Sequence, residues 1–319
     1  MSNFKPPKLL SSGFIQSFLA SYKSKSDKKH SRLFEGKWIS IQTKDGVQLL
    51  ALYHELPNPK GILILIHGWE GSIHSSYIVR TTRYFISKGY SIIRLNLRDH
   101  GDTHHLNLGL FNGSLLEETY EGIRILASQF NLPIYLAGFS LGGNFVLRIA
   151  GKHSMEKNAN KIQNLKYCFS FSPALDPKEA TLKMDKHPIL RKYFLQSWTD
   201  SLRKKQNLFP HFYNFHDIDS YKTVMDLTKK MVLEYSTFES VDSYFDSYTL
   251  KNFLFQSIRV PSLILTAKDD PVIPWNSFYG IPLTPYLEVH VEDRGGHCGF
   301  IENFSRSAYY WKLMERKMA

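Results

Sequence analysis

The sequence predicts an α/β fold, in which helices cover both faces of a mostly parallel, twisted sheet. From about residue 37 onward, short apolar stretches alternate with longer stretches whose apolar residues recur at helical spacing. This alternation is typical of strands connected by helices. The stretch GILILIHG (61–68) is continuously apolar, as expected of a strand that is covered on both faces.

The expected elements follow in chain order. The turn residues Lys44-Asp45-Gly46 separate two apolar stretches within 37–56, which predicts a β-hairpin forming one antiparallel edge of the sheet. Ser114 and Glu117 have the spacing of a capping box at a helix start. Further strands are expected within 61–68, 91–101, 133–138, 167–173, 261–271 and 286–293, and helices within 75–90, 114–130, 141–153 and 304–318.

Residues 176–255 interrupt this alternation, because they are rich in aromatic residues and lack a clear strand. Long insertions in compact domains tend to be lids or binding elements. We therefore predict a helical cap insertion in 176–255; a helical continuation of the core is the alternative. The expected division is an N-terminal arm in 1–36, core in 37–175, the cap, and core again in 256–319.

The N-terminal stretch carries much of the positive charge. The chain has a net charge of +11, and residues 1–37 hold eight Lys and Arg against two acidic residues. This charge could attract an anionic membrane or nucleic acid. Because the basic residues are scattered and no nucleic-acid-binding module is visible, we expect a solvated arm, no nucleic-acid partner, and at most a peripheral membrane contact.

The sequence also bears on location. No apolar run approaches the roughly 20 residues of a membrane helix. The stretch 9–24 faintly resembles a signal peptide, but serines, Gly13 and Gln16 break its apolar core, so we expect no cleavage. Cys168 and Cys298 are too few for a disulfide framework, which favours a reducing, cytoplasmic location.

Ser140 is the first candidate for chemistry. It lies in LAGFSLGGNF (136–145), a G-x-S-x-G pattern between an expected strand and an expected helix. At such a tight turn the serine backbone is strained, and Gly138 and Gly142 provide the space. A serine exposed at this corner can act as a nucleophile; the alternative is a glycine turn whose serine caps the helix.

A nucleophilic serine needs a base and an acid that orients the base. Loops at the carboxyl ends of parallel strands meet at one edge of a sheet, and the chain order expected for this architecture is serine, acid, histidine. His297 follows the last expected strand in a glycine-rich turn, whereas His290 lies inside that strand. We therefore expect His297 to be the base.

Four aspartates are candidates for the acid. Asp270 follows an expected strand just before Pro271 and is the first choice, with its neighbour Asp269 taken as a turn or helix-start residue. Asp176 follows the preceding strand and is the second candidate. Asp99 precedes the serine and fits the expected order poorly.

The developing oxyanion needs two donors, usually backbone N–H groups. We expect one from Leu141, directly after the serine, and one from Trp69 in the loop HGWEGS (67–72). The Trp69 ring could also form part of the pocket wall, and His67 is expected to have a packing role.

The segment RDHGDTHH raises the possibility of a metal site. Its candidate ligands are His100, Asp102, His104 and His105. Because Gly101 interrupts the H-x-x-x-H spacing and no helix is expected there, we predict no metal.

These segments together resemble the α/β-hydrolase superfamily, and within it the YheT-like esterases. The similarity rests on HGWEGS, GFSLGGNF, SPALDP, AKDDPVIP and GGHCGF, in this order. SGFIQSFLASY near the N-terminus also resembles that group's nPHlQTi segment. The similarity covers nearly the whole chain and is weakest in 176–255. This chain has RDHGD where the family usually has an Arg-Gly-Cys turn, and Trp69 where it usually has leucine.

The resemblance implies an α/β-hydrolase fold and carboxylester hydrolysis without a cofactor. It implies a catalytic triad of Ser140, Asp270 and His297, with Trp69 and Leu141 as oxyanion donors. The expected substrate is a small ester with an apolar acyl or alkyl group, lipid-like esters included. An acyltransferase, a peptidase with the same triad, and a noncatalytic ligand-binding protein on the same fold are the alternatives.

Overall fold

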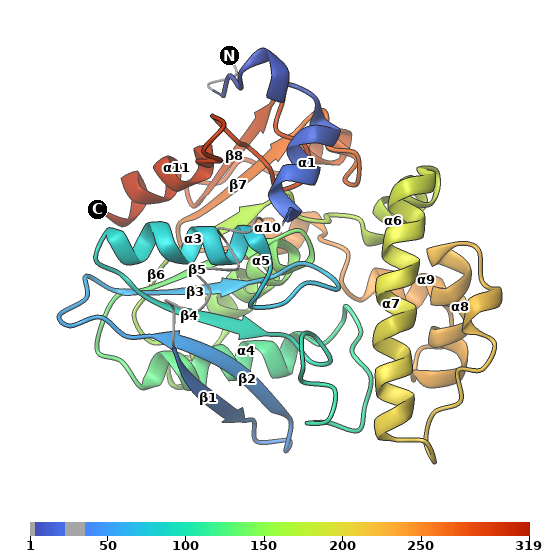
Figure 1. Cartoon of the computed structure of the whole chain (residues 1–319). Helices are drawn as coiled ribbons and strands as arrows, with labels where there is room; N and C mark the ends of the chain where they lie inside the picture. Colours follow the sequence, from blue (N-terminus) through green and yellow to red (C-terminus); the bar gives the residue numbers. More distant parts are fainter. Residues whose placement is uncertain (1–3, 23–35) are drawn as a thin grey trace.

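A computed structural model describes residues 4–22 and 36–319. Its centre is an eight-stranded sheet with the order β1-β2-β4-β3-β5-β6-β7-β8 (Figure 1). The pairs β1–β2 and β2–β4 are antiparallel and all others are parallel. The predicted mostly parallel sheet with an antiparallel hairpin at one edge is therefore confirmed.

The strands coincide with the predicted stretches, except that β5 ends one residue later and β6 begins two residues earlier than predicted. Their bounds are β1 Lys37–Gln42, β2 Gln48–His54, β3 Ile62–Ile66, β4 Ser91–Asn96, β5 Ile134–Phe139, β6 Leu165–Phe171, β7 Ser262–Ala267 and β8 Leu287–Glu292. Among the described residues, the α-helices outside the insertion are α1 Gly13–Ser21, α3 Ser76–Ser87, α4 Leu116–Ser128, α5 Leu141–Met155 and α11 Tyr309–Met318.

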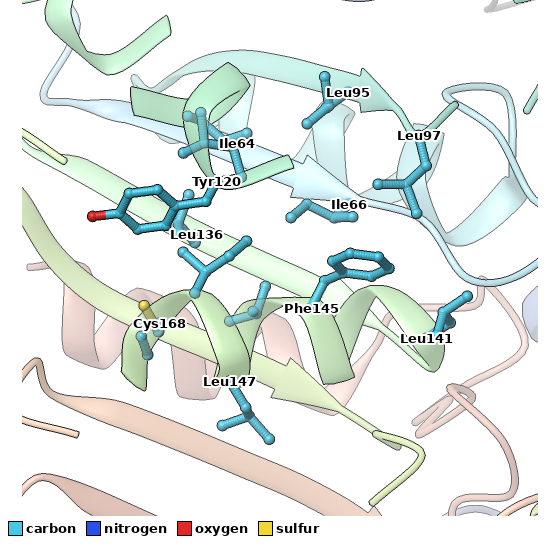
Figure 2. Close-up of a cluster of buried hydrophobic side chains, with 14 of the residues drawn as sticks. Ile64, Ile66, Leu95, Leu97, Tyr120, Leu136, Leu141, Phe145, Leu147 and Cys168 are labelled. Carbon is cyan, nitrogen blue, oxygen red and sulfur yellow. The ribbon is translucent and has the colours of Figure 1, made fainter. Parts of the chain in front are cut away.

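Apolar side chains cover both faces of the sheet. In β3, Ile64 and Ile66 belong to the cluster that includes Phe145 of α5, whereas Leu63 and Leu65 belong to a second cluster. Figure 2 shows Ile64 and Ile66 on the same side as Phe145. The second cluster contains residues of α3 and α11. Successive side chains of a strand point to opposite faces of the sheet. A strand with helices packed on both faces is therefore expected to be continuously apolar.

The interval between β6 and β7 is helical. It contains α6 Pro177–Asp185, α7 Pro188–Leu208, α8 Val224–Tyr235, α9 Val241–Asp246 and α10 Asn252–Ser257. Figure 1 shows α6 to α9 grouped to one side of the sheet. In contrast, α10 packs against α5, since Leu254 lies against Gly151. The last helix of the interval thus belongs to the core layer.

The long helix α7 is fastened to the core by a buried lysine. The side chain of Lys205 is fully buried, and its Nζ lies 2.7 Å from Asp99 Oδ1. It also donates to the carbonyl oxygens of Asn107 at 2.6 Å and of His104 and Gly109 at 3.2 Å. All three acceptors follow β4, so Lys205 joins α7 to the loop after that strand.

The N-terminal segment differs from the expected solvated arm. Phe4, Gln16 and Ala20 are buried, because residues 4–22 pack against the body of the protein. Most of the arm's basic residues fall in 23–35, outside the described residues. Within 4–22 and 36–319, no helix is both long enough and apolar enough to cross a membrane.

The predicted capping box is wrong. Helix α4 begins at Leu116, and in this fully described segment no side chain caps its N-terminus. Ser114 Oγ instead donates to Asn112 Oδ1 at 2.5 Å. Glu117 pairs with Lys152 of α5 at 3.1 Å. A local turn contact engages Ser114 and a tertiary ion pair engages Glu117, so neither side chain caps the helix.

We expect Lys205→Ala to lower the free energy of unfolding by about 3–5 kcal/mol, because it leaves the buried Asp99 carboxylate without its counter-charge. Urea unfolding followed by circular dichroism measures this change. Lys204→Ala, at the exposed neighbouring position, is the control and should change stability by less than about 0.5 kcal/mol. Equal effects of the two substitutions would contradict the anchoring role of Lys205.

Candidate active site

Ser140 occupies a strained corner between β5 and α5. Its φ of 55° and ψ of −117° lie in a region that side-chain-bearing residues rarely adopt. A Cβ atom at Gly138 would lie 2.1 Å from the carbonyl oxygen of Gly142, and one at Gly142 would lie 2.4 Å from that of Ile66. In this fully described corner the Ser140 side chain makes no capping hydrogen bond, which disfavours the helix-cap alternative.

His297 and Asp270 form a hydrogen-bonded pair. His297 Nδ1 lies 2.9 Å from Asp270 Oδ2. The other oxygen of Asp270 accepts the backbone N–H groups of Val272 at 2.7 Å and Ile273 at 2.9 Å. The carboxylate is buried and held on both oxygens, so it fixes the orientation of the imidazole.

Ser140 and the residue after His297 are both held at the carboxyl end of β6. The carbonyl oxygen of Phe171 accepts the N–H of Ser140 at 2.8 Å and lies 3.8 Å from Cys298 Sγ. Cys298 N–H also donates to Ser172 Oγ at 3.1 Å. The residue after His297 is thus fixed to the same strand end as Ser140, and the loops after β5, β7 and β8 meet there.

The electrostatics of the pair favour a charged imidazole. Burial lowers the pKa of His297, but the attraction and hydrogen bond of the Asp270 carboxylate outweigh it and raise the pKa well above the usual 6.5. An imidazole that gains a proton next to this carboxylate is therefore stabilised.

The loop after β3 passes over Ser140. A Cβ atom at Gly68 would lie 3.1 Å from the Cβ of Ser140. Buried His67 holds this loop: its Nε2 accepts the N–H of Leu97 at 3.2 Å, so Nδ1 carries the proton and donates to the Gly68 carbonyl at 2.8 Å. Burial lowers the pKa of His67 to about 3. These contacts agree with a packing role for this neutral histidine.

An apolar cavity of about 110 Å³ opens at Ser140. Trp69 and Leu141 line it together with the serine, and the opposite wall comes from the helical insertion. The Trp69 ring stacks on Phe194 of α7 at 5.5 Å and meets Trp198 edge-on at 5.2 Å. The further lining from the insertion includes Ala180, Met184, Val224, Tyr244, Phe245 and Tyr248.

Comparison with known proteins identifies the family. A model of the alpha/beta hydrolase family matches residues 63–306. The chain belongs to this family. This α/β hydrolase is 22% identical over 279 residues to the YheT protein of Escherichia coli K12, a match that covers 84% of this chain and 79% of that protein.

Two further similarities extend the comparison. The embryogenesis-associated protein EMB8 of Picea glauca is 22% identical over 256 residues, covering 77% of this chain and 55% of that protein. The chain thus spans about half the length of this relative. The crystal structure of the Pyrococcus furiosus esterase Pf2001 superimposes with a TM-score of 0.59 at 16% identity, covering 93% of both chains. Its fold is the α/β-hydrolase fold.

The other three candidate acids of the hydrolase, all within the described part of the chain, do not bond to the His297 imidazole but make contacts of their own. Asp176 caps α6, where its side chain accepts the N–H of Glu179 at 3.0 Å. Asp99 pairs with Lys205. Asp269 lies in the turn after β7, and its Oδ1 also accepts the N–H of Gly296 at 2.8 Å. The loop that carries His297 is thereby tied to the loop that carries Asp270.

His100 and His104 of the RDHGDTHH segment serve packing, whereas His105 is exposed. His100 Nδ1 lies 2.7 Å from the Arg98 carbonyl oxygen, and His104 Nε2 lies 2.8 Å from Ser201 Oγ of α7. In the part of the chain that the structure describes, no group of three or more His, Cys, Asp or Glu side chains is placed to hold a metal ion.

Sequence reasoning missed the role of α1. Ser17 Oγ accepts the backbone N–H of His297 at 2.7 Å and donates to the Gly13 carbonyl at 2.7 Å. Gln16 is fully buried, and its side chain bonds both the N–H and the carbonyl oxygen of Ile301. The resemblance of SGFIQSFLASY to a family segment was the signal that could have pointed to these residues.

We expect the pKa of His297 to lie well above 6.5, and Asp270→Asn to lower it, because the attraction of the carboxylate then no longer opposes the effect of burial. NMR titration of carbon-13-labelled histidine measures both, with His297→Gln identifying the signal. Asp176→Asn is the matched control and should leave the titration unchanged. An identical pKa in wild type and Asp270→Asn would contradict the assigned electrostatics.

Proposed function

We propose that this α/β hydrolase is a serine carboxylesterase, with Ser140 as nucleophile, His297 as general base and Asp270 as its orienting acid. The observation that carries the proposal is a strained serine that lines an apolar cavity at the same strand end that holds the loop of a histidine bonded to a buried aspartate. The backbone N–H groups of Leu141 and Trp69 are the proposed oxyanion donors, since both residues border the same cavity.

The chemistry follows from which imidazole nitrogen is engaged. In the neutral form of His297, Nδ1 donates its proton to Asp270, so Nε2 is free to take the proton as Ser140 Oγ attacks the ester carbonyl. The imidazolium then protonates the departing alcohol, leaving an acyl-enzyme. His297 next takes a proton from water, which attacks the acyl carbon, and returns that proton to Ser140 as the carboxylic acid leaves.

The cavity supports an ester with an apolar group. Its walls are mostly aliphatic and aromatic, and half of them belong to α6–α9, which we assign as the cap. The sequence similarity to YheT, which is named as an esterase, supports ester cleavage. Cys168 and Cys298 both lie among the described residues and are buried and unpaired, which suits a cytoplasmic location.

We expect Ser140→Ala to lower hydrolysis of short p-nitrophenyl esters by about 10³-fold or more, and to abolish covalent labelling by a fluorophosphonate probe. The exposed Ser128→Ala is the matched control and should retain both. Hydrolysis retained by Ser140→Ala would refute the nucleophile. A wild-type protein that neither reacts with the probe nor cleaves esters would indicate a noncatalytic binder, and cleavage of amides in preference to esters would indicate a peptidase.

We expect Ser17→Ala to lower kcat by about ten- to a hundredfold with little change in KM, because a displaced His297 impairs proton transfer more than substrate binding. Steady-state kinetics with a soluble ester separates the two parameters. Ser11→Ala removes a hydroxyl that only bonds the Lys8 carbonyl in the same segment, and it should behave like wild type. A rise in KM alone would contradict the positioning role.

A further inference from the structure

Helix α1 has its apolar side chains on the wrong side for a helix packed on a core. Gln16 and Ala20 are 0% and 1% exposed, whereas Phe14, Ile15 and Phe18 are 38%, 39% and 58% exposed. A helix on a protein surface normally turns its large apolar side chains inward. Here small and polar residues contact the body, and the aromatic and aliphatic face points outward.

The exposed apolar surface continues onto α7. The Phe14 ring stacks on His187 at 5.4 Å with an angle of 14°, directly before α7 begins. On the first turns of α7, Ile189 and Tyr193 are 63% and 57% exposed. We call this surface the outer patch; it consists of Leu9, Phe14, Ile15, Phe18, Ile189 and Tyr193. Phe14 thus connects the exposed apolar residues of α1 with the start of α7, and large exposed apolar surface marks an interaction site.

The outer patch borders the candidate active site. Tyr193 meets Phe194 edge-on at 5.3 Å, and Phe194 stacks on Trp69 at the cavity wall. On the other side, α1 holds the backbone of His297 through Ser17. Figure 1 shows α1 beside the end of the sheet formed by β7 and β8. A surface that bound the patch would therefore lie next to the cavity.

Charge identifies the occupant. Lys5 and Lys8 are exposed in the same N-terminal segment, and Lys186 and Lys192 are exposed beside the α7 part of the patch. The whole chain carries a net charge of +11. Two copies meeting through this patch would bring like charges together, whereas an anionic lipid surface would attract them. Exposed aromatic side chains flanked by lysines are typical of helices that lie in a membrane interface.

We propose that the outer patch docks this protein on anionic lipid surfaces, where Phe18 and Ile189 enter the apolar layer and the lysines meet the headgroups. The bound orientation sets the cavity beside the lipid, so lipid-like esters reach Ser140 from that surface. This last step rests on the proposed esterase function; the docking itself does not.

The test measures co-flotation of the full chain with vesicles. One set is phosphatidylcholine alone and the other contains one third phosphatidylglycerol. We expect binding to the anionic vesicles, much weaker binding to the neutral ones, and loss of affinity as salt is added. The double variant Phe18→Ser/Ile189→Ser should bind at least about tenfold more weakly. The matched control is Phe253→Ser/Leu233→Ser. These two apolar side chains lie outside the patch, and each is 65% exposed.

The outcomes separate docking from catalysis. Absence of wild-type binding, or equal binding by both double variants, would overturn the proposal. A concentration-dependent dimer in analytical ultracentrifugation that Phe18→Ser/Ile189→Ser abolishes, without vesicle binding, would identify a second copy as the occupant and also overturn it. The patch variant should hydrolyse soluble p-nitrophenyl acetate at the wild-type rate. Wild-type protein that binds vesicles but cleaves no ester would support docking and refute the esterase function.

Discussion

The close approach of α5 to the sheet is the constraint on which the rest of the site depends. Gly138 and Gly142 leave no room for a side chain between the turn and the end of β3. This packing forces Ser140 into its positive φ, at a cost of about 1–3 kcal/mol. The buried apolar cluster around Phe145 offsets that cost. The Ser140 hydroxyl therefore lies at the sheet edge, since the close packing of α5 leaves its backbone no other conformation.

Helix α1 connects two parts of the molecule that have different chemistry. Its inner face carries Gln16 and Ser17, whose hydrogen bonds hold the loop from His297 to Ile301. Its outer face carries the large apolar side chains of the outer patch. If α1 turned its apolar side chains inward, the hydrogen bonds of Gln16 and Ser17 to the His297 loop would be lost. This accounts for the small and polar character of the buried side, which allows close contact with the loop.

The sequence predicts those features that depend on local periodicity or on chain order. The apolar runs of β3 and β5, the glycine-flanked Ser140, and the late positions of Asp270 and His297 can all be recognised in this way. Contacts between distant residues have no such pattern. Ser17 and His297 are separated by 280 positions, and Lys205 and Asp99 by 106. The capping-box prediction failed for the same reason, because Glu117 pairs with a lysine on another helix.

Two departures from the family pattern meet in the structure at the same helix. Trp69 stands where the family usually has leucine, and its ring packs against Phe194 and Trp198 of α7. Asp99, in the segment RDHGD, pairs with Lys205, about three turns beyond Phe194 on that helix. An aromatic contact at one end and a buried ion pair at the other fix the long axis of α7 against the core. Trp69 and Asp99, which depart from the family pattern, are therefore the residues through which the core loops hold the helical insertion. Because the insertion forms part of the cavity wall, these contacts also determine the shape of the cavity at Ser140.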